Sequence, residues 1–156
     1  MSSDLSSQQI VVFGVGPVGR EYCKVLQCLG VNFSIVGRSE AGVEKFFAET
    51  GIKALSGGVD GWKAKGDARI QTAIVSVNLE DLAKTAIDLM DCGMQNILLE
   101  KPGAINAEEI KWIRDKAKIT GTKVWIAYNR RFFASVLKAR EIISNDGGVK
   151  SFNFEF

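Results

Sequence analysis

The sequence predicts an α/β protein with a doubly wound parallel sheet of about six strands. Short apolar runs rich in β-branched residues alternate along the chain with segments whose apolar residues recur at helical spacing. The apolar runs are nearly continuous, which is typical of strands that helices cover on both faces of a parallel sheet. Right-handed crossovers between such strands give a doubly wound sheet, whose ligands bind beyond the carboxyl ends of the strands.

Six of the apolar runs are predicted to be strands. Each is short and nearly continuously apolar, as expected for a strand that is buried on both faces. The run IKAL is the shortest of them and is a candidate strand only. In chain order the runs are Ile10–Gly14, Phe33–Gly37, Ile52–Leu55, Thr72–Val77, Asn96–Glu100 and Lys123–Tyr128.

Helices are predicted between these strands, because apolar residues there recur at intervals of three and four. Glycine follows the first four of these segments at a position typical of a helix end. The helices are expected within Val18–Leu29, Val43–Thr50, Leu82–Met90, Ile110–Ala117 and Phe133–Ile143. The segment Ser56–Asp67 carries four glycines and is predicted to be a loop that Trp62 anchors.

The last eight residues, Val149–Phe156, follow a different pattern. Phe152, Phe154 and Phe156 alternate with polar residues, which predicts an antiparallel strand with one buried face. No further strand follows with which it could pair. We therefore expect residues 1–128 to form one domain. Residues 129–156 are expected to be a connecting helix and the first strand of a missing second α/β domain, unless a partner chain supplies the sheet.

Composition and charge exclude several classes of function. A net charge of +2 on 156 residues argues against nucleic acid or a membrane surface as a partner, and no apolar run approaches the ~18 residues of a membrane span. The chain has no histidine, so we expect no metal site and no Ser-His-Asp triad. The polar N-terminus is not a secretory signal, and three cysteines without a CxxC pair favour reduced, buried thiols in the cytoplasm.

The stretch GVGPVG has the G-x-G-x-x-G spacing and lies between the first predicted strand and the first predicted helix. This is the context that a dinucleotide-binding turn requires. Gly14 permits the tight turn, Gly16 lets a pyrophosphate approach the backbone, and Gly19 lets the helix pack closely. The alternative is a tight turn without a ligand. The cofactor contacts expected here are Gly14, Val15, Gly16, Pro17, Val18 and Gly19.

The end of the second predicted strand indicates which dinucleotide is bound. A carboxylate at this place would accept the ribose 2′-hydroxyl of NAD, but the sequence has Gly37, Arg38 and Ser39. A guanidinium can stack on adenine and bind a 2′-phosphate, so we expect a preference for NADP, with NAD possible. Alternatively, Ser39 only caps the next helix and Arg38 is solvated.

The stretch NILLEKPG places two charges, Glu100 and Lys101, directly after a buried strand. On the residues alone, a solvated ion pair at a strand exit explains this pattern, and such a pair contributes little to stability. The other explanation is that both charges lie at the edge of the sheet where ligands bind. An ammonium there could polarise the oxygen of an alcohol or ketone during hydride transfer.

Three segments together resemble the glucose–fructose oxidoreductase / inositol dehydrogenase family (Gfo/Idh/MocA). They are GVGPVG, EKPGAINAEEI and AYNRRFFASVLKAREIISNDGGVKSFNFEF, in order and at fitting spacing. The resemblance implies an N-terminal Rossmann domain and a C-terminal α/β domain with a large open antiparallel sheet. It also implies oxidation or reduction of sugars, sugar derivatives or cyclitols with NAD(P), and homo-oligomers formed through the second domain.

The resemblance assigns roles to residues near the strand ends. Lys101 would be the catalytic residue, binding both substrate and cofactor, and Glu100 would lie near the nicotinamide ribose. Pro102 would fix the turn, through a bond that is often cis in the family. After the last strand, three further polar residues would line the cofactor and substrate region: Asn129 and Arg130 at the cofactor, and Arg131 at the substrate. Alternatively, these arginines lie on the surface or at a domain junction.

Two departures from the family pattern limit what the resemblance implies. The family has a Thr-Pro pair and, farther along, a histidine in this region, which here reads VNLEDL, so that Val77 and Asn78 replace Thr-Pro and Leu82 replaces the histidine. Ser76, Val77 and Asn78 remain expected cofactor contacts. The catalytic histidine and aspartate of the family belong to the second domain, so Lys101 is the only catalytic residue carried over.

Three functions follow from these observations. The first is the cofactor-binding domain of an oxidoreductase acting on a sugar-like alcohol or ketone. The second is a noncatalytic NADP-binding or sensor module that is naturally short or completed by a partner chain. The third, a methyltransferase, fits the glycine spacing poorly and lacks the acidic residue expected after the second strand.

Overall fold

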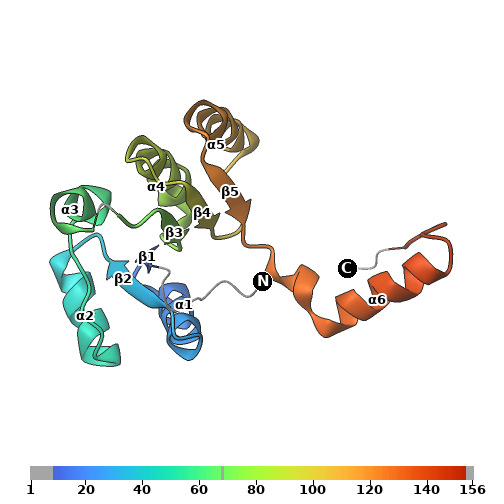
Figure 1. The fold of residues 1–156 in the computed structure, drawn as a ribbon, viewed down its shortest axis with the longest axis horizontal. Coiled ribbons are helices and arrows are strands. Elements are labelled where there is room, and N and C mark those ends of the chain that lie inside the picture. The colour runs from blue at the N-terminus through green and yellow to red at the C-terminus, as the bar shows by residue number, and fades with distance from the viewer. Residues whose placement is uncertain (1–8, 68, 154–156) are drawn as a thin grey trace.

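A parallel five-stranded sheet forms the centre of the computed structural model, which describes residues 9–67 and 69–153 (Figure 1). The strand order is β2-β1-β3-β4-β5, and every pair of neighbouring strands is parallel. Because the order reverses between β1 and β3, this point of the sheet is the one where a ligand is expected. The strands are β1 (Gln9–Phe13), β2 (Asn32–Val36), β3 (Thr72–Val75), β4 (Asn96–Leu99) and β5 (Lys123–Ile126).

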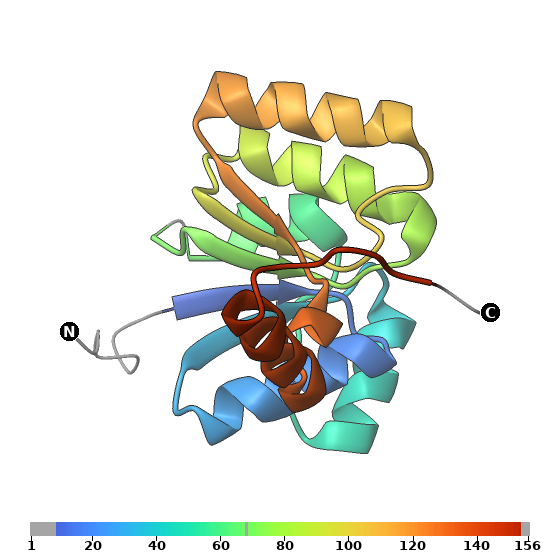
Figure 2. The ribbon, with the colours of Figure 1, turned by 90° about the vertical axis from the view of Figure 1, so that its right-hand side faces the viewer.

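Helices cover both faces of the sheet, which confirms the predicted doubly wound architecture. Figures 1 and 2 show α1 and α2 on one face and α3, α4 and α5 on the other. The chain then leaves the sheet through the short 3₁₀ helix η2 and the helix α6. Their bounds are α1 (Pro17–Cys28), α2 (Glu40–Thr50), α3 (Gly58–Lys65), α4 (Leu79–Asp91), α5 (Ala107–Thr120), η2 (Asn129–Phe132) and α6 (Ala134–Asn145).

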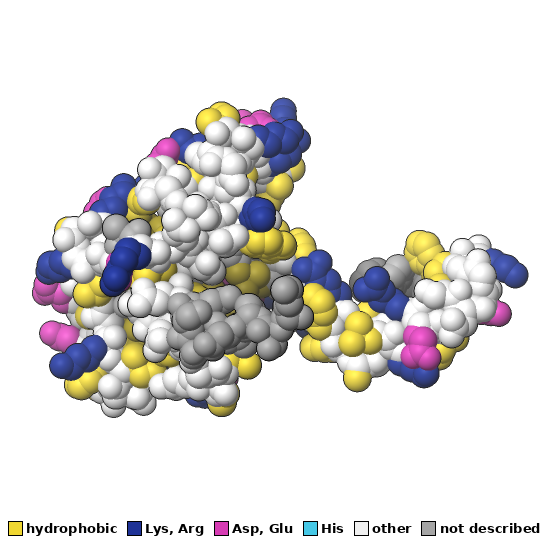
Figure 3. All heavy atoms as spheres, viewed as in Figure 1, with side chains coloured by type: hydrophobic (Ala, Val, Ile, Leu, Met, Phe, Trp, Pro, Cys, Tyr) yellow, Lys and Arg dark blue, Asp and Glu magenta, His cyan; other side chains and the backbone are white. Residues whose placement is uncertain are grey.

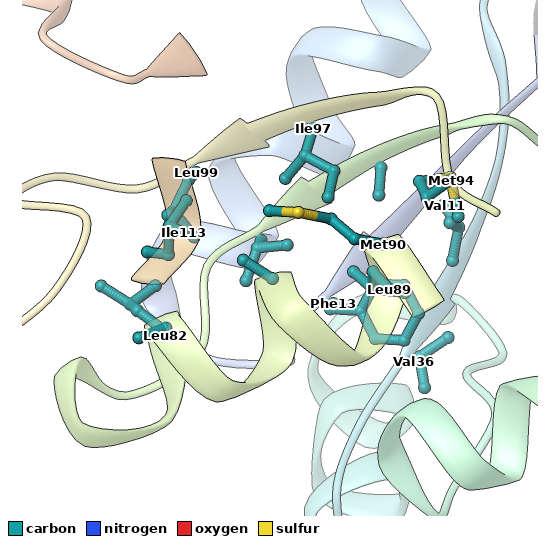
Figure 4. Packing of buried hydrophobic residues seen from close by; sticks show 14 of the residues in the cluster. Val11, Phe13, Val36, Leu82, Leu89, Met90, Met94, Ile97, Leu99 and Ile113 are labelled. Atoms are coloured by element: carbon teal, nitrogen blue, oxygen red, sulfur yellow. The ribbon is translucent and has the colours of Figure 1, made fainter. Parts of the chain in front are cut away.

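The sheet separates two hydrophobic cores, one on each face. The larger core joins α3, α4 and α5 to the strands, and Figure 4 shows Leu82, Leu89 and Met90 of α4 packed toward Ile97 and Leu99 of β4. The smaller core joins α1 and α2 to the opposite face. The alternation of apolar strands and amphipathic helices in the sequence therefore corresponds to two buried layers.

Two sequence predictions in the segment after α2 were wrong. Ile52–Leu55 is not a strand: Leu55 forms an isolated parallel bridge with Val36, so the sheet has five strands. The glycine-rich segment predicted as a loop contains the helix α3. Trp62 does anchor it, because its side chain is only 5% exposed and its ring meets Phe13 edge-on at a centroid distance of 6.0 Å.

The chain after β5 extends away from the rest of the protein, and we call residues 129–153 the C-terminal arm (Figure 1). Every residue of the arm is exposed. Figure 3 shows apolar side chains along it and near its junction with the body. The strand predicted over Val149–Phe156 is not formed at 149–153, where no neighbouring strand is present, and its last three residues lie outside the described part.

The three cysteines are free, but they do not share one environment. Cys23 is buried, and burial raises the pKa of its thiol to about 11. Cys28, at the end of α1, is exposed, which corrects the expectation that all three thiols are buried. Among the described residues, no helix combines the length and apolar character needed to cross a membrane.

Candidate functional site

A cleft of about 390 Å³ opens beyond the carboxyl ends of β1, β2 and β3. It lies at the reversal of strand order, where the sequence analysis expected a ligand. Nine of the predicted cofactor contacts line it: Gly14, Val15, Gly16, Gly37, Arg38, Ser39, Ser76, Val77 and Asn78. The topology thus brings together three short segments that are far apart in the sequence.

The three glycines of the first turn have different surroundings. Gly14 has a φ of 119°, and a Cβ there would lie 2.4 Å from the carbonyl oxygen of Ser76. A Cβ on Gly19 would lie 1.9 Å from the carbonyl oxygen of Gly14. A Cβ on Gly16 would meet no atom within 4 Å, although this residue also lines the cleft. Gly14 and Gly19 are therefore required by packing, whereas Gly16 borders open space.

Helix α1 begins at this open space. Gly16 is its N-cap and provides no side-chain hydrogen bond to the first turn, in which Pro17 and Val18 are exposed. The free N–H groups and the positive end of the helix dipole can therefore bind an anion, as at the pyrophosphate site of dinucleotide-binding turns. Pro17, Val18 and the buried Gly19 do not line the cleft themselves.

Ser76 fixes the shape of the glycine turn from the neighbouring strand. Its backbone N–H donates to the carbonyl oxygen of Phe13 at 2.8 Å, and its hydroxyl donates to the same oxygen at 3.2 Å. The side chain is buried, and the two bonds tie Ser76 to the end of β1, where the glycine turn begins. Asn78 is the N-cap of α4, but its exposed side chain makes no capping hydrogen bond and remains available to a ligand.

The segment after β2 forms the opposite wall of the cleft. A Cβ on Gly37 would lie 2.6 Å from a methyl group of Val43, so close packing requires glycine there. Ser39 is the N-cap of α2 and accepts a hydrogen bond from the N–H of Gly42, as the alternative interpretation expected. Arg38 forms an ion pair with Asp81, with 2.8 Å between Nη1 and Oδ2.

Sequence reasoning missed the polar side of α4, which lines the same cleft. These residues follow helical spacing on the side opposite the apolar residues that α4 buries against the sheet. The helical spacing of these polar residues is visible in the sequence, but the sequence analysis used only the spacing of the apolar residues. The missed residues are Asp81, Lys84, Thr85 and Asp88, together with Gly58, Val59 and Asp60 of α3.

Lys101 and Glu100 lie at the same edge of the sheet, one strand farther along. The N–H of Glu100 donates to the carbonyl oxygen of Val75 at 2.8 Å, directly beside Ser76. Lys101 is exposed, and its ammonium has no ion pair or hydrogen bond within the described residues. Neither residue lines the cleft.

Two details of this turn are informative. The Lys101–Pro102 peptide bond is cis, as the resemblance implied. Burial, and secondarily the carboxylate of Glu100, raise the pKa of the phenol of Tyr22 in α1.

The residues after β5 are farther from the cleft. Asn129, Arg130 and Arg131 belong to η2, are exposed, and do not line it. The guanidinium of Arg131 lies 5.0 Å from the ring centroid of Phe132. In the described part of the chain, no group of three or more acidic or cysteine side chains is placed to hold a metal ion.

The comparison with family models identifies the family of the chain. The family model described as oxidoreductase family, NAD-binding Rossmann fold (Gfo/Idh/MocA) matches residues 8–128. The chain belongs to this family. The resemblance inferred from the sequence motifs is thereby confirmed. None of the curated proteins compared with the chain matches it.

Solved structures with the same fold include members with bound cofactor. The chain is similar to the WlbA dehydrogenase from Bordetella pertussis in complex with NADH and UDP-GlcNAcA, with a TM-score of 0.76, 16% identity and coverage of 88% of this chain and 42% of that chain. The chain is also similar to UDP-N-acetylglucosamine 3-dehydrogenase GnnA from Acidithiobacillus ferrooxidans, with a TM-score of 0.71 and 18% identity. The match covers 86% of this chain and 41% of that chain.

A third similar structure is an NAD-binding protein from Listeria innocua, with a TM-score of 0.74 and 20% identity. The matched region covers 89% of this chain and 40% of that chain. At this level of identity the three likenesses establish the fold. The chain spans about 40% of the length of these relatives.

Proposed function

We propose that this chain is the cofactor-binding part of an oxidoreductase that transfers a hydride between NADP(H) and a sugar-, sugar-derivative- or cyclitol-type alcohol or ketone. The observation that carries the proposal is the glycine turn. Gly14 and Gly19 pack without room for a side chain, while Gly16 borders open space at the start of α1. This combination suits a pyrophosphate lying against Gly16, as the dinucleotide-binding turn requires.

The adenosine end of the cofactor is proposed to lie against Arg38 and Ser39. Arg38 is exposed and lines the cleft, so its guanidinium can reach a 2′-phosphate and can stack on adenine. The hydroxyl of Ser39 caps α2 through its oxygen but can still donate its hydrogen. Both features support NADP as the preferred cofactor, with NAD as the weaker alternative.

Lys101 is proposed as the residue that assists proton transfer at the reacting oxygen of the substrate. The nicotinamide supplies or accepts the hydride when it is bound. The Lys101 ammonium has no partner within the described residues, so it is free to donate a hydrogen bond to the reacting oxygen of a substrate. Glu100, Pro102, Asn129 and Arg130 are proposed to complete the nicotinamide end, and Arg131 to reach the substrate.

Membership of an oxidoreductase family favours this proposal over a noncatalytic sensor module and over a methyltransferase. UDP-GlcNAcA in the WlbA complex and the name of GnnA support a sugar-type substrate. We further propose a cytoplasmic location and homo-oligomers in which residues outside this chain take part.

Fluorescence titration of the chain with NADPH and NADH tests the proposed cofactor site. We expect tighter binding of NADPH. Replacement of Arg38 by alanine should weaken the binding of NADPH by about tenfold or more and the binding of NADH much less. The reason is that the charge-assisted bond of the guanidinium to the 2′-phosphate exists only with NADPH. Arg114→Ala, at an exposed arginine of α5 outside the cleft, is the matched control. Equal affinities, or an Arg38→Ala variant that keeps its NADPH affinity, would contradict the cofactor preference.

The role of Lys101 is tested by hydride transfer in a protein that contains this chain together with a substrate-binding domain. Lys101→Met should lower kcat by about a hundredfold or more, because general acid–base catalysis contributes a factor of this size. Lys118→Met, at a residue of α5 remote from the strand ends, serves as control. Unchanged turnover in the Lys101 variant would remove this residue from the mechanism.

A further inference from the structure

The ion pair between Arg38 and Asp81 joins the two walls of the cleft. Arg38 follows β2, whereas Asp81 lies in the first turn of α4, and the 2.8 Å contact between them spans 43 positions of sequence. The side chains are 76% and 38% exposed, so both are open to a ligand. In the part of the chain that the structure describes, each makes its only ion pair with the other.

The other charges of the cleft make this pair important for an anionic ligand. Lys84 is the second cation that lines the cleft, and it is engaged with Asp88. Asp88 chiefly, and Asp60 and Asp81 to a smaller extent, raise the pKa of the Lys84 ammonium. Three carboxylates therefore accompany two cations, and neither cation is free of a carboxylate partner.

A 2′-phosphate can bind Arg38 only in competition with this carboxylate. The guanidinium has several N–H donors, but the one closest to the cleft wall of α4 is used by Asp81. A phosphate placed on the remaining donors would lie close to the carboxylate and be repelled by it. NADH has only hydroxyl groups on this ribose, so the same carboxylate would not repel it.

We propose that Asp81 is a specificity-determining residue that weakens the discrimination between NADPH and NADH by competing with the 2′-phosphate for Arg38. This inference rests on the proposed dinucleotide site and deepens it. It identifies the residue that limits the preference, whereas Arg38 creates the preference. No sequence prediction gave Asp81 a role, and only the fold brings it to the adenosine end.

The experiment measures dissociation constants of the chain for NADPH, NADH, 2′,5′-ADP and 5′-ADP. The two shorter probes report on the adenosine end without the nicotinamide. Asp81→Asn keeps the size of the side chain and removes its charge. Glu80→Gln is the matched control, because Glu80 is an exposed carboxylate in the same first turn of α4 and does not line the cleft. Arg38→Ala and the double variant Arg38→Ala/Asp81→Asn complete the cycle.

We expect Asp81→Asn to strengthen binding of NADPH and 2′,5′-ADP by about two- to tenfold, the size of an exposed ion-pair contribution plus relieved repulsion. NADH and 5′-ADP should change by less than about twofold, and Glu80→Gln should leave all four probes unchanged. In the Arg38→Ala background the gain should be clearly smaller, since the carboxylate then has no guanidinium to occupy and only its repulsion of the phosphate is relieved.

Three results would overturn the inference. One is an unchanged ratio of NADPH to NADH affinity in Asp81→Asn. Another is a loss of NADH affinity in that variant, which would mean that the carboxylate binds ribose hydroxyls. The third is an equal gain in the Arg38→Ala background. If neither dinucleotide bound any variant, including the unsubstituted chain, the proposed function itself would fail, and this outcome is distinct from the other three.

Discussion

At the scale of single residues, Gly16 and Gly19 belong to one turn but have opposite surroundings. Gly19 is buried against the carbonyl oxygen of Gly14, whereas Gly16 has open space where a Cβ would project. Gly16 also has a φ of −77° and a ψ of −175°, which alanine adopts without strain. The same substitution should therefore separate folding from binding in this turn.

We expect Gly19→Ala to lower the free energy of unfolding by about 2 kcal/mol or more, because backbone must move to admit the methyl group. Gly16→Ala should change stability by no more than about 0.5 kcal/mol. It should nevertheless weaken the binding of NADPH by about tenfold, because the methyl group would occupy the place of the pyrophosphate. A loss of about 1.4 kcal/mol in binding free energy corresponds to this factor.

Urea denaturation and NADPH titration of both variants check this prediction. The two substitutions are controls for each other, since they add the same methyl group to the same turn. A Gly16→Ala variant that binds NADPH as tightly as the unsubstituted chain would place the pyrophosphate elsewhere. A destabilised Gly16→Ala variant would show that this glycine, too, is required by packing.

The residues of the cleft differ in how far the sequence alone could reveal them. The glycine turn and the segment Gly37–Ser39 were predicted because each motif is local and its position relative to a strand is readable. The ion pair of Arg38 with Asp81 was not predicted. It depends on the strand order β2-β1-β3, which places the start of α4 beside the end of β2, and no local pattern specifies this order.

At the scale of elements, α3 shows how tertiary packing overrides local preference. Its segment carries four glycines, each unfavourable in a helix, and was predicted to be a loop for that reason. The helix forms because Trp62 inserts into the core against Phe13. Gly61 is also required there, since a Cβ would lie 2.0 Å from the carbonyl oxygen of Ser56.

The burial of Trp62 leads to a prediction about α3. Its indole N–H is buried and has no acceptor within the described residues, so the ring contributes packing rather than a hydrogen bond. We expect Trp62→Ala to lower the free energy of unfolding by about 3–5 kcal/mol, the usual cost of such a cavity. Trp62→Phe keeps much of the volume and loses no hydrogen bond, so it should cost about 1.5 kcal/mol or less.

Denaturant unfolding of the two variants measures these costs, with Trp112→Phe, at an exposed tryptophan of α5, as control. A Trp62→Phe cost equal to that of Trp62→Ala would show that the indole N–H has an acceptor after all. Because α3 also supplies Gly58, Val59 and Asp60 to the cleft, Trp62→Ala should weaken cofactor binding as well.

At the scale of the whole molecule, the protein consists of a packed body and the C-terminal arm. The five strands and α1–α5 enclose both cores, to which no residue of the arm contributes. The arm instead exposes Phe132, Phe133, Leu137 and Ile142, each more than 45% accessible. Exposed apolar residues gathered in this way are typical of surfaces that another polypeptide covers.

This division predicts that residues 1–128 fold alone. A chain that ends at Tyr128 should unfold within about 1 kcal/mol of the full chain, because the deleted residues bury little apolar area and surface changes cost little. Its sedimentation coefficient should also be less dependent on concentration, since the exposed apolar side chains of the arm are removed. Thermal unfolding and sedimentation velocity measure the two effects.

The same truncation also bears on Asn129 and Arg130, which we propose to contact the cofactor. If they do, the chain that ends at Tyr128 should bind NADPH more weakly than the full chain, and the double variant Asn129→Ala/Arg130→Ala should show the same loss with the arm retained. Equal affinity in all three proteins would confine the cofactor to the body. A truncated chain that unfolds far more easily would instead place part of the fold in the arm, because stability can fall substantially only if deleted residues contributed packing to the cores.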